Sequence, residues 1–157
     1  MKEQAVIHNT FVIERSYAAT PEQVFTALSN PAKRRRWLFE GQNHAVESFE
    51  MDFRVGGHER GVMRFGPDTP FPGTLFTRDG DFRDIVANER VVSACTLAIG
   101  EKRISISLET FELLPTERGT DLIFTYQAAF FEGSDGPEMR QGGWRRLLGK
   151  LDAELAH

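Results

Sequence analysis

The chain has 157 residues, a formal net charge of −4 and 40% hydrophobic residues, which is typical of one globular domain. The acidic balance provides no overall positive field for a polyanion and argues against nucleic acid as a partner. No window approaches the roughly 18 consecutive apolar residues of a membrane-spanning helix. We therefore expect a single domain over residues 1–157, with its core in about residues 10–155, and no membrane insertion.

Two further observations concern the compartment. The N-terminus lacks the apolar core of a signal peptide. The single cysteine, Cys95, excludes an internal disulfide and, flanked by small residues in a strand-like run, is expected to be a small buried hydrophobic group. Together these features favour the cytoplasm.

The first part of the chain predicts one strand and two short helices. Residues 11–17 have the composition of a strand, and Thr20 and Gln23 form a capping-box pattern at the start of a helix over residues 21–28. Pro31 can open a second helix over residues 32–37. The four cations in residues 33–36 of that helix are interpreted as a solvated face beside an apolar anchor, Trp37.

From residue 46 onward the pattern is that of consecutive strands. Alternating hydrophobic residues and turn signals predict about six consecutive antiparallel strands, within residues 46–53, 58–65, 74–78, 82–86, 90–99, 103–114 and 121–131. Asp79-Gly80 is interpreted as a tight turn. Residues 66–73 hold three prolines and two glycines and are expected to form a loop at the rim, which could be mobile.

The last stretch, residues 136–157, predicts a long amphipathic helix. Its apolar residues recur at helical spacing and form one face that must pack against another element; they are Trp144, Leu148, Leu151 and Leu155. Helices segregated from a run of strands indicate an α+β fold. The economical arrangement is a curved antiparallel sheet of about six to seven strands around this helix, with two short helices after the first strand. A largely apolar cavity can remain where the helix bridges the curve.

Several motifs, in order over residues 10–155, resemble the heat-shock protein 90 ATPase activator homologue family of the START-like, or SRPBCC, superfamily. They are residues 12–17, residues 19–25, Asn30-Pro31, Arg36-Trp37, residues 53–57, residues 80–86, residues 89–92 and Gly143-Trp144. The resemblance implies a helix-grip fold with a cavity beneath the C-terminal helix. Relatives include carriers of hydrophobic ligands, aromatase/cyclase-like enzymes and a chaperone activator. Residues 124–133 are similar to a bacterial subgroup called polyketide cyclase-like, although Tyr126 replaces an expected acidic residue.

The leading hypothesis is a protein that binds a small hydrophobic ligand, aromatic or acyl, between the sheet and the C-terminal helix. The expected lining is Trp37, Phe53, Met63, Phe65, Phe76, Phe82, Met139, Arg140, Gly143 and Leu147. Arg140, near the apolar face, either extends to solvent or contacts an anion such as a carboxylate or phenolate at the cavity mouth. Gly143 serves either close packing or pocket volume.

Two other functions stay open. An aromatase/cyclase-like enzyme would rely on Arg140, Tyr126 and Glu109, but the sequence has no nucleophile motif. His58 and Glu59 lie on opposite faces of a strand and lack metal-ligand spacing, so we expect surface histidines, no metal and no cofactor. A chaperone-activator domain ranks last, because nothing before residue 10 could be the second domain of the named activator. A homodimer stays open.

Overall fold

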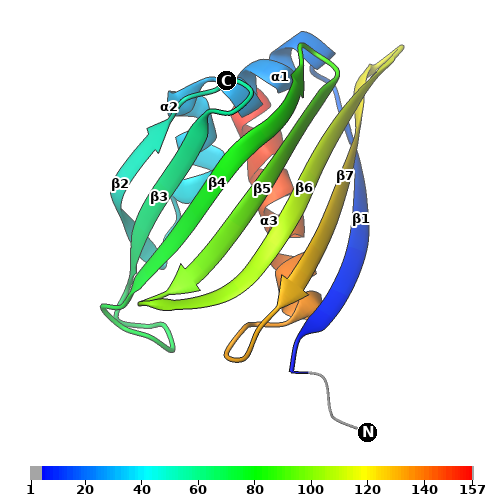
Figure 1. The fold of residues 1–157 in the computed structure, drawn as a ribbon. Helices are drawn as coiled ribbons and strands as arrows, with labels where there is room; N and C mark the ends of the chain where they lie inside the picture. The colour runs from blue at the N-terminus through cyan, green and yellow to red at the C-terminus, as the bar shows by residue number, and fades with distance from the viewer. Residues whose placement is uncertain (1–4, 157) are drawn as a thin grey trace, which may run out of the picture.

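The computed structural model of the protein describes residues 5–156, in which one seven-stranded antiparallel sheet dominates (Figure 1). Its strands are β1 (Ile7–Tyr17), β2 (His44–Met51), β3 (His58–Phe65), β4 (Leu75–Val86), β5 (Arg90–Ile99), β6 (Lys102–Thr116) and β7 (Gly119–Phe130). The order across the sheet is β1-β7-β6-β5-β4-β3-β2, so β2 to β7 form a meander and β1 closes against β7. The end of the predicted helix at His157 lies outside the described residues.

In the described part of the chain, three helices and one π-helical turn complete the fold. α1 (Pro21–Ser29), α2 (Pro31–Arg34) and the π-helical segment η1 (Arg35–Phe39) connect β1 to β2 at opposite edges of the sheet. α3 (Pro137–Leu155) runs along the concave side of the curved sheet and packs against η1, α1 and β1 (Figure 1). The predicted α+β fold, with a curved sheet around a long C-terminal helix, is confirmed. Among residues 5–156, no helix is long and apolar enough to cross a membrane.

The predicted helix start at Thr20 is confirmed in detail. The Thr20 side chain accepts a hydrogen bond from the Gln23 amide at 3.2 Å, and the Gln23 side chain accepts one from the Thr20 amide at 2.9 Å. This reciprocal pair satisfies two backbone donors that the helix leaves free. Asn30 caps α2 in a similar way, through the Lys33 amide at 3.1 Å.

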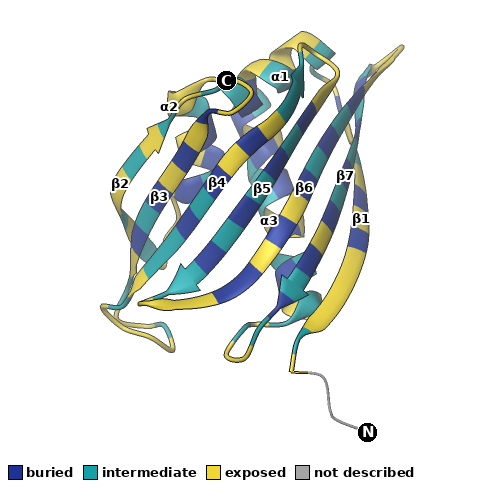
Figure 2. Ribbon diagram, viewed as in Figure 1, coloured by how far each residue is buried: buried dark blue, intermediate teal, exposed yellow. Residues whose placement is uncertain are grey.

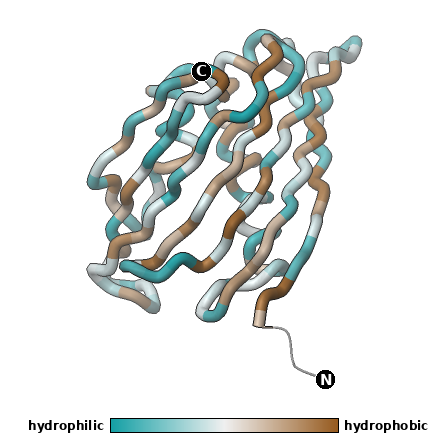
Figure 3. Tube along the Cα trace, viewed as in Figure 1, coloured by the Kyte–Doolittle hydropathy of each residue, from teal (hydrophilic) through white to brown (hydrophobic). Residues whose placement is uncertain are grey.

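The core lies between α3 and the inner faces of the central strands. Buried and exposed residues alternate along the strands (Figure 2), and hydrophobic and hydrophilic residues are interspersed along them (Figure 3), as expected when one face of a sheet is covered. Trp144, Leu148 and Leu151 of α3 are buried, as their spacing predicts. The Trp144 ring lies 4.4 Å from the ring of Phe124 in β7, between centroids. The helix therefore gains its stability from burial of one face.

The predicted tight turn at Asp79-Gly80 is wrong, because β4 passes straight through these residues. Gly80 is paired with Cys95 of β5. A Cβ atom at Gly80 would lie 2.7 Å from the Cys95 sulfur, so the glycine allows close approach of a buried neighbour and makes no turn. Cys95 is a buried small side chain, as predicted.

The predicted solvated face over residues 33–36 is also wrong at one residue. Arg34 is fully buried, whereas Arg35 and Arg36 are exposed. Residues three apart lie on the same side of a helix, so Arg34 follows the buried Trp37 inward. The π-helical turn then extends the helical segment to Phe39, two residues beyond the predicted end.

Candidate functional site

A largely apolar cavity of about 210 Å³ lies beneath the first half of α3. It is formed by α3, η1, the strands β3, β4 and β5, and the loop that follows β7. Its lining is Leu38, Phe39, Met63, Phe76, Arg78, Leu97, Asp135, Arg140, Gly143, Trp144 and Leu147. Larger hollows, of about 580, 440 and 270 Å³, lie at the turn after β6, between α1 and the end of α3, and beside β1, β6 and β7. Polar residues make up most of the lining of each. The cavity beneath α3 is better suited to an apolar ligand than these hollows.

Half of the residues predicted from the sequence to bind ligand lie together at this cavity. They come from three separate elements, β3, β4 and α3, and are Met63, Phe76, Arg140, Gly143 and Leu147. The bent sheet and the helix thus bring residues more than 80 positions apart into one wall.

The other five predicted residues lie elsewhere. Trp37 and Phe82 are each 1% exposed within the closed core, and Phe53 packs edge-on against Phe82. Phe65 packs against Phe76 but is not part of the lining. Met139 is 66% exposed, because it occupies the side of α3 that faces solvent. Hydrophobicity alone could not separate a cavity wall from a filled core or a surface position.

Gly143 leaves space at the cavity. A Cβ atom built there would meet nothing closer than the Arg146 guanidinium at 3.9 Å. No strand or helix therefore requires a glycine at this position for close packing. Of the two interpretations open from the sequence, this geometry favours pocket volume.

The Arg140 side chain does not extend to solvent, and its guanidinium is already paired with an anion of the protein, Asp135. Its side chain is buried, and its Nε and Nη2 atoms donate to the two Asp135 carboxylate oxygens at 2.9 and 2.7 Å. Its Nη1 donates to the Ser105 hydroxyl at 2.8 Å and to the Tyr126 hydroxyl at 2.6 Å. The guanidinium also lies over the Phe130 ring, 5.0 Å from its centroid. Both sequence interpretations of Arg140 are thus replaced by an ion pair within the protein, in which Arg140 is buried and the Asp135 side chain keeps 28% of its surface exposed.

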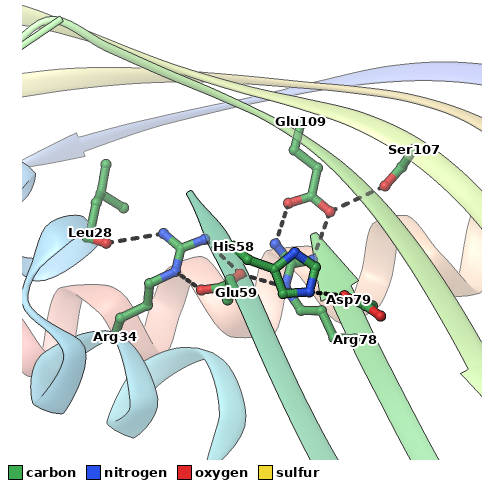
Figure 4. A network of polar contacts seen from close by, with 8 residues as sticks. All are labelled: Leu28, Arg34, His58, Glu59, Arg78, Asp79, Ser107 and Glu109. Carbon is green, nitrogen blue, oxygen red and sulfur yellow. Dashed lines mark hydrogen bonds and ion pairs between the residues drawn. The ribbon is translucent and has the colours of Figure 1, made fainter. Parts of the chain in front are cut away.

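A second buried network lies on the sheet side of the cavity (Figure 4). Arg78 donates to both carboxylate oxygens of Glu109, at 2.8 and 2.7 Å, and to Glu59 at 3.2 Å. Arg34 reaches the same Glu59 from α2 through two of its nitrogens. The Ser107 hydroxyl donates to Glu109 at 3.2 Å. Charged groups with almost no solvent exposure are thereby held by opposite charges.

Three groups at or next to the cavity, Glu59, Asp135 and Tyr126, have shifted pKa values. Burial alone would raise the pKa of Glu59, but Arg34 and Arg78 outweigh that effect and hold it below its ordinary value. Burial likewise opposes ionisation of Asp135, yet the hydrogen bonds from Arg140 lower its pKa. Burial raises the pKa of Tyr126. All three shifts move away from neutral pH, so these groups suit binding and orientation better than proton transfer.

The sequence interpretation considered Glu59 with His58 and set it aside, and it missed Arg78 and Asp135 as parts of the site. Glu59 shares the inward face of β3 with Gly61 and Met63 by strand alternation, which is a readable signal. Arg78 shares the face of Phe76 and Phe82, but the turn assigned at Asp79-Gly80 hid that alternation. Asp135 lies in an irregular loop, where no periodicity indicates direction.

Neither His44 nor His58 belongs to the cavity lining. His58 is exposed and contacts the carboxylates of Asp79 and Asp81, which raise its pKa, first through the hydrogen bond with Asp81. His44 contacts the backbone carbonyl of Phe39 at 2.5 Å. Within residues 5–156, no group of three or more His, Cys, Asp or Glu side chains is placed to hold a metal ion.

Comparison with known proteins gives a consistent result. The sequence profile of a family described as Activator of Hsp90 ATPase homolog 1-like protein matches residues 18–156. A solved structure from Rhizobium loti is 42% identical, with a TM-score of 0.85, over 96% of this chain and 99% of the other. A putative uncharacterized protein from Rhizobium leguminosarum is 34% identical, with a TM-score of 0.86, over 96% of each chain.

A more distant structure supports the fold alone. An AHSA1-like protein from Aeromonas hydrophila is 20% identical, with a TM-score of 0.66, over 94% of this chain and 92% of that chain. No protein with a curated description matches the chain.

Proposed function

Because this chain belongs to the Activator of Hsp90 ATPase homolog 1-like family, of the START-like helix-grip superfamily, we propose that it binds a small hydrophobic ligand beneath α3. One observation carries the proposal. An apolar cavity of about 210 Å³ lies beside Gly143 of α3, where the absence of a side chain leaves space between the helix and the sheet. A glycine inside a helix costs roughly 1 kcal/mol relative to alanine. That cost has no compensation in close packing here.

The size of the cavity limits the ligand. Pockets for drug-sized molecules are typically about 300–1,000 Å³, whereas an apolar cavity of about 150 Å³ holds benzene. A volume of about 210 Å³ therefore fits a single aromatic ring with a short substituent, or a short acyl chain.

An aromatase/cyclase-like activity is the second candidate from the resemblance, and the cavity supports it less well. Such an enzyme needs a group that exchanges protons near neutral pH. Asp135 and Arg140 form an ion pair with each other, and the buried hydroxyl of Tyr126 accepts a hydrogen bond from Arg140. The polar side of the cavity is thus suited to holding a ligand without reacting with it.

Native mass spectrometry of the purified protein tests the proposal directly. We expect a co-purified small molecule, or, after its removal, saturable binding of toluene. Binding would be followed by the amide chemical shifts of the lining residues Phe76, Leu97 and Gly143. No co-purified molecule and no saturable shift at these residues would overturn the proposal.

Substitution of Gly143 provides a matched pair of variants. Gly143→Leu places a side chain in the cavity and should reduce toluene affinity by at least about tenfold, equivalent to about 1.4 kcal/mol. Gly142→Leu makes the same change one residue earlier, outside the lining, and should bind toluene as the wild type does. Calorimetric titration measures both. Equal affinities in the two variants would place the ligand elsewhere.

A further inference from the structure

We propose that the ligand is uncharged and that Asp135 is the residue that sets this preference. The inference rests on the proposed function, because it concerns the ligand of the same cavity. It replaces the anionic ligand that an arginine near the apolar face would suggest.

Arg140 already has its anion. Asp135 binds the guanidinium through two oxygens, at 2.7 and 2.9 Å, in the bidentate geometry that an incoming carboxylate would need. Ser105 and Tyr126 accept from the remaining terminal nitrogen, Nη1. A ligand carboxylate could reach this fork only by displacing Asp135.

Arg78, the other cation of the lining, is also paired with carboxylates. Glu109 binds it through two oxygens and Glu59 through a third. Glu59 in turn pairs with Arg34. Two guanidinium groups are therefore balanced by two carboxylates, all of them buried.

The described lining contains no charged side chain besides Arg78, Asp135 and Arg140. An added charge of either sign would enter a balanced and largely apolar space without an opposite charge of its own. Moving an unpaired charge out of water is far more costly than moving a neutral group. A neutral molecule of the same shape avoids this cost, so the wall selects against both acids and amines.

Asp135 controls this balance of charge because, of the three side chains that bind Arg140, it is the one that carries a charge and comes from the loop before α3. Its side chain keeps 28% of its surface exposed, whereas the groups that hold Arg140 from the sheet, Ser105 and Tyr126, are buried. Replacing Asp135 with asparagine would remove the negative charge beside Nε and Nη2 and leave Arg140 anchored at Nη1. The site would then favour a carboxylate.

Three probes of matched size test the inference: benzyl alcohol, benzoate and benzylamine, titrated calorimetrically at about pH 7. In the wild type, benzyl alcohol should bind at least about tenfold more tightly than either charged probe. In Asp135→Asn, benzoate should gain at least about tenfold in affinity while benzyl alcohol stays within about threefold of the wild type. Asp84→Asn removes a carboxylate that pairs with Arg90 away from the cavity, and should behave as the wild type.

The outcomes separate the two proposals. Wild-type binding of benzoate or benzylamine as tight as that of benzyl alcohol would overturn the inference but leave ligand binding intact. Failure of toluene and all three probes to bind would overturn the proposed function itself. If folded Asp135→Asn binds benzoate no more tightly than the wild type does, Asp135 does not set the preference for an uncharged ligand. The wild-type comparison needs no variant, so the inference stays falsifiable even where Asp135→Asn fails to fold.

Discussion

At the scale of single residues, two kinds of glycine have opposite roles in this protein. Gly61 of β3 lies under the ring of Phe39, and a Cβ atom there would lie 2.2 Å from a ring carbon. Gly142 of α3 has open space, with the nearest atom 3.7 Å from a built Cβ. The first glycine is required by packing and the second is not.

Gly61→Ala should therefore destabilise the protein, by about 1–3 kcal/mol, because the buried Phe39 ring must move. Gly142→Ala should stabilise it by up to about 1 kcal/mol through helix propensity. Urea denaturation measures both free energies of unfolding. A Gly61→Ala protein as stable as the wild type would show that Phe39 does not pack on β3 as described.

The burial or capping role of a residue could be predicted from the sequence where local spacing indicated it. The burial of Trp144 and the cap at Thr20 followed from local spacing and were correct. Arg34 could have been found by its spacing from Trp37, but its charge argued against burial until Glu59 supplied a partner from another element. Asp135 could not be found, because its role depends on where a loop meets Arg140 in space.

At the scale of elements, a single hydrogen bond ties α3 to the first strand. The Tyr17 hydroxyl of β1 is buried and donates to the backbone carbonyl of Leu148 at 2.9 Å. Burial raises the pKa of Tyr17 above its ordinary value, so the hydroxyl keeps its proton as a donor. The bond links residues 131 positions apart.

Tyr17→Phe should cost about 0.5–1.5 kcal/mol of stability, the usual net value of one hydrogen bond, while the ring keeps its packing. Tyr17→Ala should cost about 3–5 kcal/mol, because the ring is lost as well. Thermal and urea unfolding measure both. Equal losses in the two variants would indicate that the hydroxyl, rather than the ring, holds the helix.

The elements themselves were predicted unevenly. Strand alternation and turn residues located most of the sheet, since both signals are local. The π-helical turn η1 was missed because its wider winding leaves no distinct sequence pattern, yet it places Leu38 and Phe39 at the cavity. The continuity of β4 was missed because glycine signals a turn and a close strand contact alike.

At the scale of the whole molecule, the buried network of Arg34, Glu59, Arg78 and Glu109 joins α2 to three strands. Glu59→Gln leaves two buried guanidinium groups short of an anion. We expect a loss of about 3–5 kcal/mol at neutral pH, the cost of breaking a buried pair from one side. Glu47→Gln, which alters an exposed pair with Arg64, should cost about 1 kcal/mol or less.

The same network predicts a pH dependence of a definite sign. The pKa of Glu59 is lower in the folded protein than its ordinary value of 4.5, so its contribution is fully present above that pH. The contribution is lost as the pH falls through the folded pKa. We therefore expect the free energy of unfolding of the wild type to fall more steeply than that of Glu59→Gln as the pH is lowered from neutral to below 4.5. Urea unfolding at a series of pH values measures both. Parallel curves would contradict the assignment.

The sheet order also has a consequence for how the chain is made. β1 pairs along its whole length with β7, from Ile7 opposite Phe130 to Tyr17 opposite Thr120. Strands β2 to β7 can pair with neighbours as each leaves the ribosome, whereas β1 emerges early and has no partner until the last strand is synthesised. Contacts of such sequence separation form slowly because loop closure must precede them. We therefore expect the N-terminal strand to stay unpaired at least until β7 has been synthesised.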